Sequence, residues 1–158
     1  MAAAAASAFS RVQLDVLDLV RGAGTMPLDA LLERVAGELR SHFGTYTGVY
    51  FYWMDGPDAL VLRAHSGRPT VHTRIPVSVG ICGRAAREKH TVIVDDVSAD
   101  PSYLVCSVET RSEIVVPIMK GDVVLGEIDI DGDKARAYGP ADQRFLEELA
   151  RAIAARVD

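Results

Sequence analysis

The chain has 158 residues, of which 49% are hydrophobic and 25% are charged, and its formal net charge is −5. This composition is typical of a globular domain and excludes an intrinsically disordered chain. The acidic balance, with no block of lysine and arginine, predicts no binding to nucleic acid or to an anionic membrane surface. A chain of this length is expected to fold as one compact domain.

The sequence has two cysteines, Cys82 and Cys106, which are too few for a disulfide-stapled scaffold. Neither has a second cysteine or a histidine at the spacing of a zinc site, so no metal site is expected. The first seven residues lack the features of a signal peptide, and no segment reaches the roughly 18 apolar residues of a membrane span. These features predict a reduced, cytoplasmic protein.

The first half of the chain predicts helices followed by strands. Hydrophobic residues at helical spacing predict helices over residues 10–20 and 28–39. Aromatic and β-branched residues then predict strands over 48–54 and 59–65, joined as a hairpin, and a short strand near 72–77. A short helix over 84–89 and a strand over 91–94 are expected next.

A polar segment over residues 95–112 has little periodicity and is long for a connection inside a small domain. Such a segment usually either binds something or is disordered. Strands over 114–118 and 123–131 and a helix over 140–154 complete the chain. This order favours an α+β fold, an antiparallel sheet flanked by helices. We expect residues 1–27 to form an N-terminal helix and connection, and residues 28–158 a single domain.

The two cysteines have different settings. Cys106 lies in the polar segment, where a thiol has little apolar surface to contact, so a functional role is favoured over packing. Cys82 lies between glycines just before a predicted helix, where the helix N-terminus favours the thiolate. A structural role for Cys82, as a small residue between strand and helix, is an equal alternative.

Strand alternation places three acids, Glu127, Asp129 and Asp131, on one face of the last strand. Adjacent carboxylates repel one another, so this pattern favours a site that binds a ligand ammonium or keeps one carboxyl protonated. The alternative is an edge strand that uses charge against aggregation. Glu113, which precedes an apolar run, is either a polar strand opener or a buried acid.

Tyr46, Tyr50 and Tyr52 are placed on one strand face by the same alternation. They are predicted either as core residues or as the wall of a pocket for a small apolar or cationic group. The four histidines are scattered, and no serine-hydrolase triad can be assembled from them.

Several short motifs occur in an order that resembles a known family. They are Tyr46–Tyr50, Gly80–Gly83, Cys106, Ser112–Pro117 and Gly126–Asp131. Together they resemble the free methionine-(R)-sulfoxide reductases, oxidoreductases built as single GAF domains, from about residue 28 to the C-terminus. The resemblance implies a GAF-type, PAS-like fold, with an antiparallel sheet of six strands, helices on one side and a ligand pocket on the other.

By this resemblance Cys106 is the catalytic cysteine. Its thiolate is implied to attack the sulfoxide sulfur, release methionine and become a sulfenic acid. Glu113, Asp129 and Asp131 are implied to bind the sulfoxide and ammonium groups, with one carboxylic acid as the proton donor.

The resemblance also implies substrate contacts for Tyr46, where the family usually has tryptophan, and for Tyr50. At His72 the family commonly has a further cysteine, which forms the recycling disulfide with the catalytic one. Cys82 is then expected to resolve the sulfenic acid of Cys106, unless a small thiol does so directly. No bound cofactor is implied, and thioredoxin is the external thiol reductant that the family suggests.

Two other functions are open at this point. One is a non-catalytic GAF module that binds a small molecule or senses redox state through its two cysteines. The other is a dimerising domain whose first and last helices pair across a two-fold axis, which is compatible with either activity.

Overall fold

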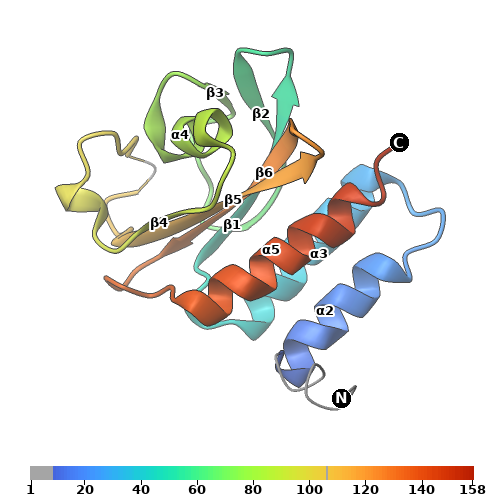
Figure 1. Ribbon diagram of the computed structural model, residues 1–158. Helices are drawn as coiled ribbons and strands as arrows, with labels where there is room; N and C mark the ends of the chain where they lie inside the picture. The colour runs from blue at the N-terminus through green and yellow to red at the C-terminus, as the bar shows by residue number, and fades with distance from the viewer. Residues whose placement is uncertain (1–8, 106) are drawn as a thin grey trace.

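The computed structural model describes residues 9–105 and 107–158, and within them it has one six-stranded sheet and four α-helices (Figure 1). The strands are β1 (Gly48–Asp55), β2 (Ala59–Gly67), β3 (Arg74–Pro76), β4 (Val92–Val94), β5 (Ser112–Lys120) and β6 (Val123–Gly132). The helices are α2 (Arg11–Arg21), α3 (Leu28–His42), α4 (Gly80–Glu88) and α5 (Pro140–Ala154), with a 3₁₀ turn, η1, at Val97–Ala99. The predicted α+β class is confirmed.

The strands run in the order β3-β2-β1-β6-β5-β4, and every neighbouring pair is antiparallel. The predicted hairpin of β1 and β2 is present. The centre of the sheet is formed by β1 and β6, which come from opposite halves of the chain. Because β6 has a partner on both sides, its three acids do not belong to an edge strand, and that alternative is excluded.

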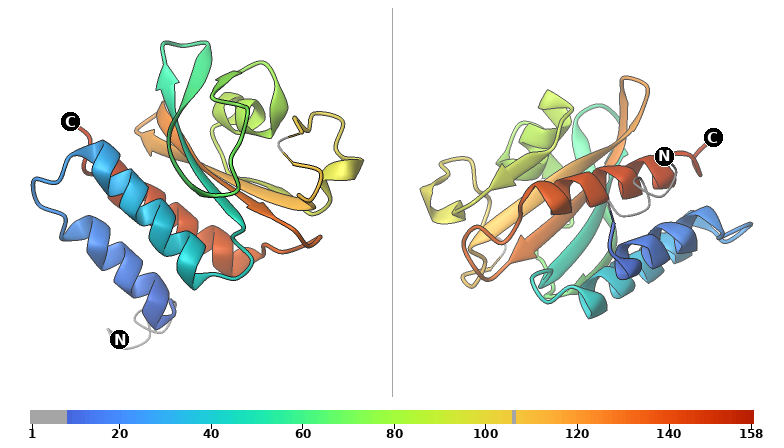
Figure 2. Two further views of the ribbon diagram at one scale, coloured as in Figure 1. Left: turned by 180° about the vertical axis from the view of Figure 1, so that it is seen from behind. Right: turned by 60° about the horizontal axis from the view of Figure 1, so that its bottom comes forward.

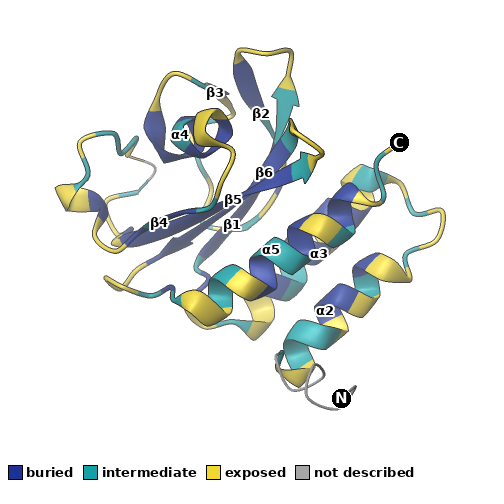
Figure 3. Ribbon diagram, in the orientation of Figure 1, coloured by how far each residue is buried: buried dark blue, intermediate teal, exposed yellow. Residues whose placement is uncertain are grey.

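Different helices cover the two faces of the sheet (Figures 2 and 3), and each face has its own core. Helices α3 and α5 cover one face, α2 packs outside them, and the side chains between them include Leu17, Leu32 and Phe145. Helix α4 lies on the opposite face, over a smaller core that contains Tyr50 and Ile81. The acids of β6 point to the α4 side, because Ile128 and Ile130 between them belong to the larger core.

Helix α4 begins at Gly80, four residues before the predicted start. Glycine lowers the helix propensity of a sequence, but the structure requires glycine at both positions here. Gly80 has a φ of +74°, which side-chain-bearing residues rarely adopt, and a Cβ at Gly83 would lie 2.7 Å from the Val77 carbonyl oxygen. Cys82 consequently lies inside the first turn of α4 rather than before the helix.

Helix α5 begins with Pro140, whose fixed φ suits the first helical position. Asp142 in the first turn accepts a hydrogen bond from the Gly139 N–H, at 3.0 Å. In the described part of the chain, no helix combines the length and the apolar character that crossing a bilayer requires.

Candidate functional site

The acids predicted to share a strand face lie together at the centre of the sheet, beneath α4. Asp129 pairs with Val115 on one side and with Tyr50 on the other. The exposed fractions are 3% for Glu113, 0% for Glu127, 2% for Asp129 and 2% for Asp131. Glu113 is therefore a buried acid and not a solvated strand opener.

Cys82 joins this cluster from α4. Its Sγ donates a hydrogen bond to Asp129 Oδ2 at 3.3 Å. Cys82, Glu113 and Asp129 each offer a ligand atom, and these atoms lie within 4.8 Å of one another. The three residues line a small cavity, whose other walls are Ile75, Gly80, Ile81 and Leu104. The fold thus brings together residues from α4, β5 and β6.

The thiol of Cys82 is held in its protonated form, contrary to the prediction from the helix N-terminus. Burial raises its pKa well above the usual value, and the negative charges of Asp129, Glu127 and Glu113 raise it further. The effect of a helix dipole is about 0.3–1 kcal/mol in most settings, which burial among carboxylates outweighs.

Burial also favours the neutral form of the carboxyl groups on β6. It raises the pKa of Glu127 and of Asp131, each helped by the nearby charge of Asp129. Burial raises the pKa of Asp129 too, although hydrogen bonds with Glu113 and Cys82 oppose this. Within the described residues, both side-chain oxygens of Glu127 and one each of Asp129 and Asp131 have no hydrogen-bond partner. A buried oxygen without a partner lowers the stability of the fold unless a proton, a ligand or a cation reaches it.

Glu127 is the residue of this cluster that the sequence interpretation left out of the site. Alternation already placed it on the acid face. Its complete burial was not visible in sequence, because that depends on β1 and β5 flanking β6.

The predicted tyrosine face is divided between the two cores. Tyr50 and Tyr52 lie on the α4 side, and the Tyr50 hydroxyl donates to the Arg68 carbonyl oxygen at 2.5 Å. Tyr46 lies in the helix-side core, where its ring stacks on Phe43 with centroids 4.8 Å apart. The alternation does not extend to Tyr46 because β1 begins only at Gly48.

Replacing Tyr46 with phenylalanine is expected to lower stability. The Tyr46 hydroxyl donates to Asp142 Oδ1 at 2.8 Å in a largely buried setting, where burial and Asp142 raise the pKa of the phenol. A hydrogen bond to a charged group contributes about 1.5–3 kcal/mol, so urea denaturation should show a loss of that size. Tyr138→Phe, which removes a bond to a neutral carbonyl, should cost less, and an equal or larger loss there would contradict this account.

Cys106, the predicted nucleophile, lies outside the described residues, but the chain around it is held at two points. His72 Nε2 hydrogen-bonds the Val105 carbonyl oxygen at 2.8 Å. Arg68 pairs with Glu109 at 2.5 Å and forms two bonds, of 2.8 and 2.9 Å, with Asp133, the residue that follows β6. The loop between β2 and β3 therefore connects the segment on both sides of residue 106 to the sheet.

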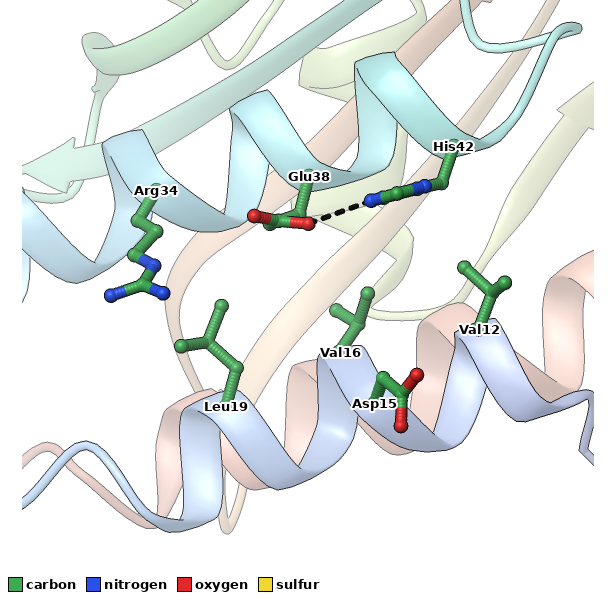
Figure 4. A pocket seen from close by; sticks show the side chains of 7 residues that line it. All are labelled: Val12, Asp15, Val16, Leu19, Arg34, Glu38 and His42. Atoms are coloured by element: carbon green, nitrogen blue, oxygen red, sulfur yellow. Dashed lines mark hydrogen bonds and ion pairs between the residues drawn. The ribbon is translucent and has the colours of Figure 1, made fainter.

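A separate groove runs between α2 and α3 (Figure 4). It is lined by Val12, Asp15, Val16, Leu19, Arg34, Glu38 and His42, and His42 bonds Glu38 across one turn at 2.9 Å. Among the residues that the structure describes, no predicted site residue lines this groove.

Comparison with known proteins identifies the family. Residues 25–158 match the family model described as a GAF domain. GAF domain-containing protein A of Dictyostelium discoideum is 34% identical over 124 residues, which are 78% of this chain and 77% of that protein. The chain belongs to the GAF domain family.

Within this family the GAF domain resembles free methionine-R-sulfoxide reductases. The Saccharomyces cerevisiae enzyme of that name is 38% identical over 109 residues, 68% of this chain and 60% of that protein. The Neisseria meningitidis enzyme, solved in complex with its substrate, superposes with a TM-score of 0.85 at 33% identity, over 94% of this chain and 90% of that one. The resemblance predicted from the sequence is thus confirmed.

Proposed function

We propose that this GAF domain reduces free methionine-(R)-sulfoxide to methionine. The observation that carries the proposal is the buried cluster of Cys82, Glu113 and Asp129 around a small cavity. A water-excluded group of carboxyls suits a small cationic ligand such as the ammonium of a free amino acid. Relatives named for this activity, one of them solved with its substrate, support the same substrate class.

The chemical step assigned to Cys106 transfers the sulfoxide oxygen to the enzyme. The Cys106 thiolate attacks the sulfoxide sulfur while a carboxylic acid protonates the oxygen. The protonated oxygen then passes from the substrate sulfur to the Cys106 sulfur as the bond between the two sulfurs breaks. Methionine leaves, and Cys106 becomes a sulfenic acid. We assign binding of the sulfoxide and ammonium to Glu113, Asp129 and Asp131. The raised pKa values of Asp129 and Asp131 favour a proton donor at neutral pH.

Recycling needs a second thiol. We propose that Cys82 condenses with the sulfenic acid of Cys106, forming a disulfide and water, and that a thiol reductant such as thioredoxin then reduces the disulfide. The Cys82 thiol is 4% exposed and its pKa is raised, both of which slow such a reaction. We therefore expect recycling, and not oxygen transfer, to limit turnover.

The direct test is methionine release from the separate R and S epimers of free methionine sulfoxide, with dithiothreitol as the reductant. We expect release from the R epimer and none from the S epimer. A folded, fully reduced protein that releases methionine from neither epimer would contradict the proposal.

The second candidate is a non-catalytic GAF module that binds an amino acid and senses redox state. The low reactivity expected for the Cys82 thiol, with His72 where the resemblance implies a cysteine, favours it. Such a module would bind methionine sulfoxide and return it unchanged, which the same assay detects when bound ligand is recovered and analysed.

Replacing His72 with alanine is expected to slow methionine release about 2–10-fold, the usual effect of one neutral hydrogen bond. The change removes the bond from His72 Nε2 to the Val105 carbonyl oxygen, beside Cys106. His72→Gln keeps a side-chain N–H donor and should recover most of the rate. Equal losses in both variants, measured as the single-turnover rate of methionine release from the R epimer, would contradict a positioning role.

A further inference from the structure

The cluster beneath α4 has ligand atoms arranged for a cation. Cys82 Sγ and Asp129 Oδ2 are 3.3 Å apart. Zinc bonds of about 2.3 Å to sulfur and about 2.1 Å to oxygen place two tetrahedral ligands about 3.6 Å apart. Together with Glu113, the three residues form a triangle whose ligand atoms all lie within 4.8 Å of one another. Modest side-chain movement would bring all three onto one ion.

A second observation also points to a ligand here. Asp129 Oδ1 has no hydrogen-bond partner in the described residues, and Asp129 lines the cavity. Buried carboxylate oxygens in this state are stabilised by a cation that enters the cavity.

We propose that Cys82, Glu113 and Asp129 form a binding site for a thiophilic divalent cation of the zinc type. The sulfur ligand decides the class of metal, since thiolate selects zinc-like ions whereas magnesium and calcium prefer oxygen ligands alone. Three protein ligands leave a fourth position for water. On binding, the metal–sulfur bond replaces the sulfur–hydrogen bond of Cys82, and that proton passes to solvent.

The site has a consequence for catalysis, which rests on the proposed function. Glu113 and Asp129 are the residues we assign to the substrate ammonium, so a bound metal and methionine sulfoxide compete for the same carboxylates. The metal also occupies the sulfur proposed to regenerate Cys106. Zinc should therefore act as a reversible inhibitor that raises KM.

The test is titration of Co²⁺ into the reduced, metal-free full chain without oxygen, followed by absorption spectroscopy. We expect one Co²⁺ per chain, a thiolate-to-cobalt charge-transfer band, and the intense visible bands of a four-coordinate site. Zn²⁺ should remove these bands by displacement, and a large excess of Mg²⁺ should not. These signals do not depend on reductase activity, so they decide the metal site even if the proposed function fails.

Matched cysteine variants locate the site. Cys82→Ser should lose the charge-transfer band and bind Co²⁺ at least about 100-fold more weakly, whereas Cys106→Ser should keep both. Glu113→Gln should weaken binding at least about 10-fold while keeping the band. Circular dichroism and thermal melts establish that each variant is folded. Absence of a band in the folded wild type, or a band lost only in Cys106→Ser, would overturn the proposal.

Discussion

Cys106→Ser should lower methionine release from the R epimer by about 1,000-fold or more, because a serine hydroxyl is a poor nucleophile toward sulfur. The substitution changes one atom and lies in a polar segment, so the melting temperature should be almost unchanged. Release measured under single-turnover conditions, without added reductant, isolates the oxygen-transfer step. A variant that still releases methionine at the wild-type rate would place the nucleophile elsewhere.

Cys82→Ser is the matched control for this prediction. Its hydroxyl can still donate to Asp129, so the acid cluster keeps its hydrogen bond. We expect this variant to release about one methionine per chain in the first turnover and then to depend on the direct attack of a small thiol. Its multiple-turnover rate with thioredoxin should fall much further than its first-turnover rate. Equal losses in both phases would contradict the resolving role.

Asp129→Asn should lower kcat/KM by about 100-fold or more, the usual contribution of a positioned general acid together with a charged substrate contact. The amide keeps the shape of the side chain but can neither donate an acidic proton nor attract an ammonium group. Asp129 can serve as the acid when protonated or attract the ammonium when ionised, because it lines the cavity and has an oxygen without a partner in the described residues. Steady-state kinetics with the R epimer provides the measurement.

Glu127→Gln is the control for Asp129→Asn, because it lies on the same face of β6 and is equally buried. Glu127 is not among the residues that line the cavity, so its activity loss should stay within about 10-fold. Equal losses of activity in Asp129→Asn and Glu127→Gln would contradict this prediction. They would mean that the acids act through their total charge and not through individual contacts with the substrate.

Glu127→Gln should also change how the stability of the protein depends on pH. Burial raises the folded-state pKa of Glu127, so the folded protein holds a proton that the unfolded chain releases once the pH exceeds about 4.3. The free energy of unfolding therefore falls as the pH rises from the unfolded-state pKa of Glu127 to its folded-state pKa. At higher pH the loss stays constant. Glu127→Gln removes this contribution. Urea denaturation with a chelator present should show a gain over wild type at pH 7 that disappears near pH 4.

The alternation of apolar and acidic residues along β6 made it predictable that the acids share one face of the strand. Ile128 and Ile130 alternate with Glu127, Asp129 and Asp131, and a strand can satisfy that pattern only by separating the two sets. The central position of β6 could not be predicted in the same way, because its partner β1 lies far away in the sequence. The pairing of β6 with β1 buries the acids, and this burial raises their pKa values.

Two local expectations were wrong for a related reason, namely the thiolate-favouring position of Cys82 and the strand face that Tyr46 was expected to share with Tyr50 and Tyr52. The helix N-terminus near Cys82 is a local feature and was visible, but the carboxylates that oppose it come from β5 and β6. Tyr46 precedes β1, and its contacts with Phe43 and Asp142 turn it to the helix side. Residues distant in sequence therefore determine the environment of Cys82, whereas that of Tyr46 depends on where β1 begins and on the distant Asp142.

The central pairing of β1 with β6 has a consequence for synthesis in the cell. The ribosome releases β1 long before β6, so the inner edge of β1 has no native partner until residue 132 has been made. Contacts of such long range slow folding, and an unpaired strand edge invites association with other chains. The nascent chain should therefore acquire its buried acids late, and shortened chains that end before β6 should aggregate or be captured by chaperones.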